Sequence, residues 1–391
     1  MNYILFDGPS RNNLLPFTYT RPVADIRIGI LTIREKWEVY LGYTTTTVTE
    51  DYLSPKYPMV EMEENIMINA SFTPNVELVT LIQSLSENQA IFKGEDLIAF
   101  FTKDSQDEVN LEAYEAIEYD GDCLFIENTW DIFYKNDRAI QDDFELITKN
   151  RTSQPIPTSN NVIAPEHIFI EEGAIVQFAS LNASKGPIYI GKNTEVMEGS
   201  LIRGPFALGE GGVVKLGTKI YGATTVGPNC TVGGELKNSV IFQNSNKGHE
   251  GYLGNAVIGE WCNIGADSNN SNLKNNYAEV RIWDYNTESF ARTGLQFCGL
   301  MMGDHSKCGI NTMFNTGTVI GVSANIFGSG FPRNFIPSFS WGGKSGFSTY
   351  LTKKAFEVAK VVMERREIDF TQDDANILEH VFESTKMYRR S

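Results

Sequence analysis

The chain has 391 residues, a length that favours two or three domains over one. Its formal net charge is -16 and its sequence pI is near 4.8, so the overall field repels nucleic acid and anionic lipid, and we expect neither as a partner. The five cysteines include no CxxC pair, the first residues lack the basic start of a signal peptide, and no apolar stretch of about 18 residues occurs. These features favour a reducing, cytoplasmic setting without a disulfide framework or a membrane span.

The first 150 residues show short strand and helix patterns. Residues 3–6 form an apolar starter strand, 76–85 follow Pro74 with helical periodicity, and 97–101 are strand-like. This alternation predicts a Rossmann-like α/β domain over residues 1–150. Residues 151–161 contain two prolines among serine, threonine and asparagine, which predicts a linker.

The middle of the chain repeats every six residues. A period of six fits neither an amphipathic helix nor simple strand alternation. It is typical of a parallel β-helix built from hexapeptides, in which one aliphatic residue per short strand stacks into a central column. The unbroken run consists of Ile190, Val196, Ile202, Leu208, Val214, Ile220, Val226 and Val232.

The period is interrupted and restarts, and the sequence predicts that loops leave the coil at the interruptions. A slip of two residues falls at 184–187, and longer interruptions fall at 235–251 and 267–300. The hexad resumes twice, as Tyr252, Ile258 and Ile264, and then as Met302, Cys308, Phe314, Ile320 and Ile326. We therefore expect the β-helix to extend over residues 162–330.

Residues 331–391 predict a loop followed by helices packed on the coil. The segment from Ser329 to Ser348 is rich in glycine, proline and serine, and apolar residues then recur at helical spacing from Ala355 onward. Thr371 and Asp374 have the spacing of a capping box that opens the last helix.

Residues 235–267 resemble the acetyltransferase half of the bifunctional UDP-N-acetylglucosamine pyrophosphorylase / glucosamine-1-phosphate N-acetyltransferase family. That family has a lysine twelve residues before a histidine, then Tyr-Leu-Gly and a hexad ending Asn-Ile-Gly-Ala. The chain matches this spacing with Lys237, His249, Tyr252 and Asn263. Further on, Asn276 and Tyr277 resemble the family's Asn-Tyr pair.

This resemblance implies a left-handed β-helix, a homotrimer, and acetyl transfer from acetyl-CoA to glucosamine 1-phosphate. His249 matches the family's general base, and an imidazole suits that task near neutral pH. The implied contacts to the acceptor sugar phosphate are Arg203, Lys237, Tyr252, Asn263 and Asn276. The implied contacts to acetyl-CoA are Ala266, Asp304 and Val322.

The amino-terminal stretch DGPSRNNLLPFTYTRP resembles the phosphate-binding opening of a sugar nucleotidyltransferase. Gly8, Arg11 and Arg21 match positions that bind the nucleotide, which implies UTP as a substrate and Mg²⁺ if the domain is active. The stretch has one glycine where the family has two, and no acid stands at 68–71, where the family's metal-binding aspartate would fall. The metal ligands are therefore not identified, and the pattern resembles a branch with a shortened domain from Bacteroidetes-type bacteria.

Two other functions remain open. The chain could be a nucleotidyltransferase for another sugar 1-phosphate whose β-helix serves assembly or regulation, or a non-catalytic scaffold that binds a sugar nucleotide. A zinc site at Cys298, His305 and Cys308 is not expected, because a fourth ligand is missing.

Overall fold

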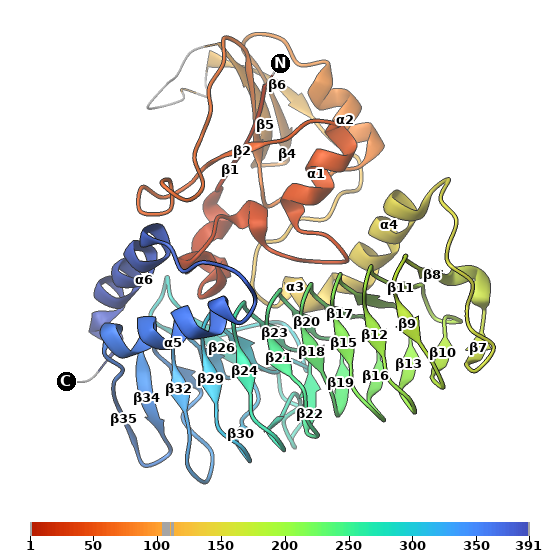
Figure 1. Cartoon of the computed structure of the whole chain (residues 1–391). Helices are drawn as coiled ribbons and strands as arrows, with labels where there is room; N and C mark the ends of the chain where they lie inside the picture. The colour runs from red at the N-terminus through yellow and green to blue at the C-terminus, as the bar shows by residue number, and fades with distance from the viewer. Residues whose placement is uncertain (1, 104–109, 111–112, 390–391) are drawn as a thin grey trace.

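The structure, a computed structural model, describes residues 2–103, 110 and 113–389. Figure 1 shows three parts: an α/β domain at the top, a long parallel β-helix below it, and a pair of C-terminal helices beside both. The predicted fold class is therefore confirmed for an α/β domain followed by a parallel β-helix and terminal helices.

The first domain is built on one mixed sheet. Strand β1 lies between β2 and β3 and is parallel to both, whereas β5 is antiparallel to its neighbours. The strands are β1 (Asn2–Phe6), β2 (Thr46–Val48), β3 (Asn65–Asn69), β4 (Gln89–Lys93), β5 (Asp96–Thr102) and β6 (Glu115–Glu118). The helices are α1 (Ile33–Leu41), α2 (Val76–Gln83), α3 (Asp131–Tyr134) and α4 (Asn136–Thr148). The predicted strands at 3–6 and 97–101 and the helix near 76–85 are confirmed.

The β-helix has three faces, each a sheet of short strands from successive coils. The six-stranded first face contains β7 (Asn161–Ile163), β10 (Ser180–Asn182), β13 (Leu201–Arg203), β16 (Lys219–Tyr221), β19 (Glu235–Lys237) and β22 (Tyr252–Gly254). The nine-stranded second face contains β8 (Ile168–Ile170), β11 (Ile188–Ile190), β14 (Phe206–Leu208), β17 (Thr224–Val226), β20 (Val240–Ile241), β23 (Val257–Ile258), β28 (Met301–Met302), β31 (Val319–Ile320) and β33 (Phe335–Ile336). The ten-stranded third face contains β9 (Ile175–Val176), β12 (Glu195–Val196), β15 (Val213–Val214), β18 (Thr231–Val232), β21 (Asn246–Lys247), β24 (Asn263–Ile264), β29 (Lys307–Cys308), β32 (Asn325–Ile326), β34 (Ser340–Gly343) and β35 (Gly346–Thr349).

The predicted aliphatic column is the core of the coil. All eight residues from Ile190 to Val232 in the hexad run are at most 2% exposed and belong to one apolar cluster. Cys308 is 4% exposed in the same cluster, as the hexad register predicts.

The prediction that the coil is interrupted at 235–251 and restarts at Tyr252 is wrong. Strands β19, β20 and β21 continue the coil through this segment, and Leu253, at 2% exposed, occupies the column where Tyr252 was expected. The step between successive column residues shortens to four at Leu236 and to five at Ile241 and at Ile258, which breaks the strict hexad. The column position on β21 is held by Lys247 in place of an aliphatic residue.

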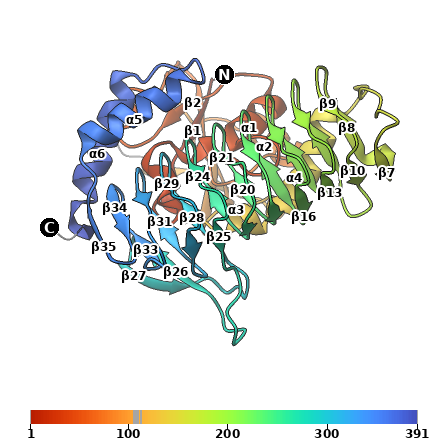
Figure 2. The same cartoon turned by 60° about the horizontal axis from the view of Figure 1, so that its bottom comes forward.

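The segment 267–300 does leave the coil, as predicted. It contains β25 (Asn269–Asn270), which pairs with β30 (Met313–Phe314), and the hairpin of β26 (Arg281–Asp284) and β27 (Ser289–Arg292). Figure 2 shows this hairpin beside the C-terminal coils.

The last part of the chain completes the coil before the helices begin. Residues 335–349 were expected to be a loop, but they contain β33, β34 and β35, because β33 and β34 pair with the strands of the preceding coil and β35 pairs with β34. The terminal helices α5 (Thr352–Glu364) and α6 (Gln372–Ser384) follow, and the predicted capping box at Thr371 and Asp374 is present. The buried stripe of α5 is Ala355, Ala359 and Met363.

The first domain is docked on the second face of the β-helix. Outward residues of that face, including Phe242, share one apolar cluster with the core of the first domain, and the rings of Phe17 and Phe242 lie 5.4 Å apart. Asn136, at the start of α4, is fully buried and donates from Nδ2 to Thr225 Oγ1 at 3.1 Å. The first face of the β-helix is left uncovered by the first domain (Figure 1).

All five cysteines are free thiols. Among the residues that the structure describes, each helix is too short or too polar to span a bilayer.

Candidate functional site

The candidate site is built on two stacked corners, where the third face turns into the first. Residues 248–251 form one corner between β21 and β22, and 265–268 form the next, between β24 and β25. The amide of Asp267 donates to the carbonyl oxygen of Glu250 at 2.9 Å, so the two corners are in direct contact. Because Asn246 pairs with Asn263, His249 and Ala266 occupy equivalent positions in neighbouring coils.

His249 stands at the outer edge of its corner and is exposed. Its imidazole forms no hydrogen bond with any residue that the structure describes. The amide of Ala266 likewise has no acceptor within the described part of the chain. A base and a free N–H donor are thus presented side by side at the surface, an arrangement that can remove a proton and stabilise a developing oxyanion.

Lys237 lies on the first face, at the end of β19 that is farther from this corner, where it pairs with Gly254. Its Nζ stands over two aromatic rings, 5.7 Å from the centroid of Tyr221 and 5.6 Å from that of Phe297. Lys237 forms no ion pair within the described residues, so its ammonium group is held by cation–π contacts and can still bind an anion.

Tyr252 begins β22, the strand beside Lys237. Its hydroxyl oxygen accepts from Asn272 Nδ2 at 2.9 Å, which leaves the hydroxyl hydrogen free to donate to a ligand. Burial raises the pKa of Tyr252, while the bond from Asn272 lowers it less, so the phenol stays protonated at neutral pH.

Gly254 makes room for the phenol of Tyr252. A Cβ atom at Gly254 would lie 2.2 Å from the Tyr252 hydroxyl oxygen, and real Cβ contacts of that length do not occur. We therefore expect Gly254→Ala to displace the Tyr252 side chain, which, on the acceptor role that the resemblance implies for Tyr252, would raise KM for the sugar phosphate. Gly309→Ala is the matched control, because its nearest neighbour would be at 3.5 Å. An unchanged KM in Gly254→Ala would show that the position of Tyr252 does not matter.

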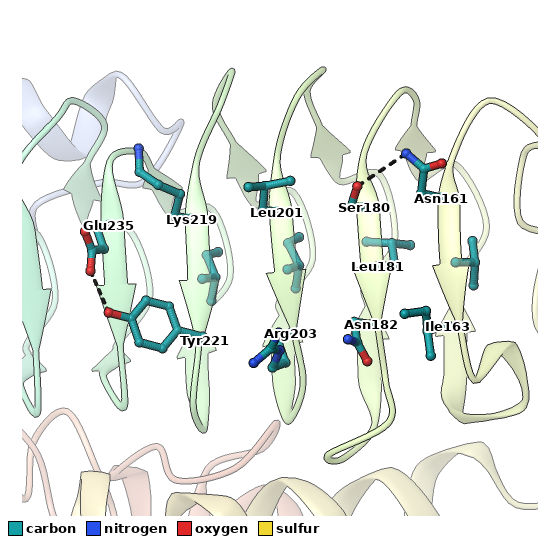
Figure 3. A pocket seen from close by; sticks show the side chains of 13 residues that line it. Asn161, Ile163, Ser180, Leu181, Asn182, Leu201, Arg203, Lys219, Tyr221 and Glu235 are labelled. Atoms are coloured by element: carbon teal, nitrogen blue, oxygen red, sulfur yellow. Dashed lines mark hydrogen bonds between the residues drawn. The ribbon is translucent and has the colours of Figure 1, made fainter.

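A shallow pocket of about 710 Å³ runs along the first face, away from the corner. Figure 3 shows Arg203 and Tyr221 side by side within it. The Tyr221 hydroxyl donates a hydrogen bond to the carboxylate of Glu235 at 2.6 Å. Lys219 lies in the pocket and its Nζ is 3.6 Å from the carboxylate of Glu250, which joins the pocket to the His249 corner. Arg203 thus shares a face with Lys237 but lies two strands away, on β13.

Asn263 and Asn276 lie outside the first face. Asn263 is exposed on β24 of the third face, so the corner of His249 separates it from Lys237 and Tyr252. Asn276 is exposed in the loop after β25, where its side chain accepts from the amide of Ala278 at 3.1 Å. The same excursion instead contributes Asn272 and Phe297 to the site.

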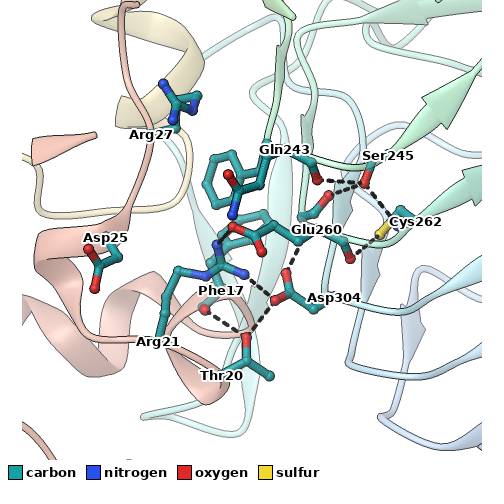
Figure 4. Close-up of polar contacts among 12 residues, drawn as sticks. Phe17, Thr20, Arg21, Asp25, Arg27, Gln243, Ser245, Glu260, Cys262 and Asp304 are labelled. Carbon is teal, nitrogen blue, oxygen red and sulfur yellow. Dashed lines mark hydrogen bonds and ion pairs between the residues drawn. The ribbon is translucent and has the colours of Figure 1, made fainter. Parts of the chain in front are cut away.

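Two predicted ligand contacts, Arg21 and Asp304, are paired with each other. Arg21 belongs to the first domain and is 4% exposed, and its guanidinium donates to the carboxylates of Asp304 and Glu260 on the β-helix. Thr20 Oγ1 also donates to Asp304, at 2.7 Å. Figure 4 shows this cluster between the two domains. Because these charged groups are buried and paired across the two domains, they join the first domain to the β-helix.

Val322, another predicted ligand contact, is also engaged within the protein. Its side chain is fully buried in the cluster that holds α5 and α6 against the corner between β31 and β32, with Phe339, Leu378 and Val381. Its amide donates to Ser338 Oγ at 3.0 Å, so neither part of Val322 is available to a ligand.

Gly8 and Arg11 line a pocket of about 400 Å³ in the first domain. Arg11 is 7% exposed and donates from Nη2 to the Thr18 carbonyl at 2.8 Å and to the Tyr52 hydroxyl at 3.0 Å. Its Nε also lies 3.1 Å from the carboxylate of Asp7. Gly8 approaches Asn69 so closely that an added Cβ would lie 2.7 Å from its side-chain amide.

The described residues include no group of three histidine, cysteine or acidic side chains that could hold a metal ion. At the expected metal position, the side chain of Asn69 instead accepts from the amide of Ser71 at 3.0 Å and donates to the carbonyl of Leu97 at 3.0 Å. That position therefore offers no carboxylate to a Mg²⁺ ion.

The fold and these pockets define a chain in which an α/β domain of nucleotidyltransferase type is joined to a hexapeptide β-helix. In agreement, residues 3–152 match the family model described as sugar nucleotidyl transferase. The match covers the whole first domain but less than half of the chain.

Three curated relatives carry the name "Bifunctional protein GlmU". The protein of Methanocaldococcus jannaschii is 28% identical over 210 residues, which are 54% of this chain and 45% of the relative. The protein of Methanococcus vannielii is 27% identical over 330 residues, which are 82% of this chain and 64% of the relative. The protein of Synechococcus elongatus is 24% identical over 237 residues, which are 54% of this chain and 48% of the relative. The chain thus spans less than half of the first of these relatives.

Solved structures with related coils include a UDP-N-acetylglucosamine acyltransferase from Arabidopsis, with a TM-score of 0.25, 17% identity, and 55% of this chain and 80% of that one covered. Another is LpxA, a UDP-N-acetylglucosamine acyltransferase from Bacteroides fragilis, with a TM-score of 0.20, 13% identity, and 57% and 96% covered. At these TM-scores the superpositions carry no argument about function.

Proposed function

We propose that the chain transfers the acetyl group of acetyl-CoA to the amine of glucosamine 1-phosphate, with His249 as the general base. The observation that supports this proposal is that His249 shares one edge of the β-helix with the start of β22 at Tyr252 and with the free amide of Ala266, while Lys237 stands on the neighbouring strand β19 of the adjoining face. The spacing of these residues matches that of the acetyltransferase family described above.

In the proposed reaction, the amine nitrogen attacks the thioester carbonyl carbon while His249 takes a proton from that nitrogen. The Ala266 amide donates to the oxyanion of the tetrahedral intermediate. The intermediate then collapses, the C–S bond breaks, and the thiolate of CoA takes the proton from the imidazolium. Lys237 binds the sugar phosphate, Tyr252 donates to a sugar oxygen, and Arg203 is a more distant phosphate contact on the same face.

We further propose that the active protein is a homotrimer, in which a neighbouring subunit covers the corner. On one chain, the His249 edge is open to solvent and lies in register with the exposed side chains of Leu216 and Ile310, at 63% and 69% exposed. Apolar groups in line with a catalytic edge favour coverage by another subunit. Asn263 and Asn276, which stand apart from Lys237 in one chain, could then act across such an interface.

The second candidate activity is uridylyl transfer from UTP to N-acetylglucosamine 1-phosphate in the first domain. The family match over residues 3–152 and the pocket at Gly8 and Arg11 favour it. Two features argue against it: Arg21 is paired with Asp304 of the β-helix, and Asn69 rather than an aspartate stands at the expected metal position.

A paired assay separates the candidates. Purified protein is mixed with glucosamine 1-phosphate and acetyl-CoA, and free thiol is followed; UTP, magnesium and N-acetylglucosamine 1-phosphate are then supplied, and pyrophosphate is followed. We expect thiol release that depends on the amino sugar. Pyrophosphate without thiol release would favour a nucleotidyltransferase whose β-helix serves assembly, and silence in both assays would favour a non-catalytic scaffold.

A further inference from the structure

Lys247 occupies a position in the β-helix that is otherwise reserved for apolar residues. On the third face, the neighbouring strands β18 and β24 place Val232 and Ile264 in the column, and β21 places Lys247 there. The lysine is 1% exposed and is among the largest fully buried side chains of the described residues. An ammonium group in an aliphatic column is costly unless its donors are satisfied.

The three donors of Lys247 are all directed at backbone carbonyls around the His249 corner. Nζ donates to the carbonyl oxygens of His249 and of Glu250, the latter at 3.3 Å. It also donates to the carbonyl oxygen of Gly233 in the preceding corner, at 3.2 Å. A lysine ammonium has three N–H groups, so these contacts use all of them. No carboxylate pairs with it within the described residues.

The pKa of Lys247 is lowered by its surroundings. Burial lowers its pKa to about 8, and the more distant Glu250, Cys308 and Asp267 offset this only in part. A methionine would fill the same space without the cost of a buried charge. Packing alone therefore does not account for a lysine at this position. Hydrogen bonds from its ammonium group to the consecutive carbonyls of His249 and Glu250 do account for it.

We propose that Lys247 is a positioning residue that ties down the 248–251 corner and thereby fixes His249 beside the amide of Ala266. The side chain reaches the corner from inside the coil, so it holds the backbone of His249 without touching a substrate. The catalytic part of this inference rests on the proposed acetyl transfer, whereas the ordering of the corner does not.

Lys247→Met tests the inference, because methionine keeps the volume and removes the donors. We expect deuterium exchange in the peptide 246–254 to rise on the order of ten- to a hundredfold, since hydrogen bonds from a charged group are lost. The thermal unfolding midpoint should stay the same or rise, because a buried charge is replaced by an apolar group. In the acetyl transfer assay, kcat should fall on the order of ten- to a hundredfold with little change in KM, because the base is misplaced while the binding face is intact.

Val214→Ala is the matched control, because Val214 lies two strands away in the same column and touches no corner carbonyl. It should lower the midpoint and leave exchange at 246–254 and kcat unchanged. The inference is overturned if Lys247→Met leaves exchange unchanged, or if the corner loosens while kcat stays at the wild-type value. If the wild-type protein releases no thiol, the proposed function fails, and the exchange measurement still decides whether Lys247 orders the corner.

Discussion

Replacing His249 with alanine is expected to lower kcat for acetyl transfer by about 10²- to 10⁴-fold, the usual contribution of a positioned general base. The imidazole is exposed and forms no hydrogen bond with a described residue, so its removal should leave folding unchanged. KM for the sugar phosphate should also change little, because Lys237 and Tyr252 remain in place. The measurement is thiol release at saturating substrates, together with a thermal melt.

His167→Ala is the matched control for this experiment. His167 is an exposed histidine at another corner of the same β-helix, next to Glu166, and it has no partner in the proposed site. It should retain full activity. A His249→Ala variant with wild-type kcat would remove the histidine from the mechanism, even if the chain proves to be an acetyltransferase.

Replacing Arg21 with alanine is expected to lower the free energy of unfolding by about 3–5 kcal/mol, the typical cost of breaking a buried ion pair from one side. The variant would leave the carboxylates of Asp304 and Glu260 without their guanidinium, with Asp304 only 3% exposed. Burial alone would lower the pKa of Arg21, but the two carboxylates raise it above its ordinary value, so the arginine stays charged at any practical pH. Denaturant unfolding, followed by circular dichroism, measures the loss.

Arg138→Ala provides the comparison for Arg21→Ala. Arg138 also pairs with two acids, Asp122 and Asp142, but its side chain is 42% exposed. Solvent-exposed pairs contribute about 0–1 kcal/mol, so this variant should unfold almost as the wild type does. Equal losses in the two variants would contradict a role for Arg21 in holding the domains together.

The buried arginine also bears on the first domain. Arg21 matches a nucleotide-binding position of sugar nucleotidyltransferases, yet the β-helix supplies both of its anionic partners. A phosphate would have to compete with two carboxylates that are already in place. The first domain and the β-helix are thus coupled through the same side chain that the resemblance assigns to nucleotide binding.

The period of six made the β-helix predictable, because a stacked coil requires one buried residue per short strand. The strict rule then misplaced the restart at Tyr252, since Lys247 is not aliphatic and three steps of the coil between Val232 and Ile258 are shorter than six residues. A lysine in the column leaves no hydrophobic signal, so its role follows only from its contacts with carbonyls. Lys237, His249 and Tyr252 all lie within a single coil, and the roles that their spacing implies stay predictions.

Sequence patterns did not predict the contacts between distant parts of the chain. Arg21 and Asp304 are 283 residues apart and meet only because the first domain docks on the second face. Asn272 and Phe297 reach the site from an excursion whose asparagine-rich composition predicts a loop but not its path. Long-range docking of this kind depends on shape and on apolar surface that becomes visible only in the folded chain.

The central claim is that glucosamine 1-phosphate is acetylated on its amine, and it is tested most directly by identifying the product. The protein is incubated with acetyl-CoA and either glucosamine 1-phosphate or glucose 1-phosphate, which has a hydroxyl group in place of the amine. Mass spectrometry and thiol release are followed together. We predict N-acetylglucosamine 1-phosphate in an amount equal to the thiol released, and no acetylated product from glucose 1-phosphate. Thiol release that is the same with both sugars, or no acetylated amino sugar, would contradict the proposed function.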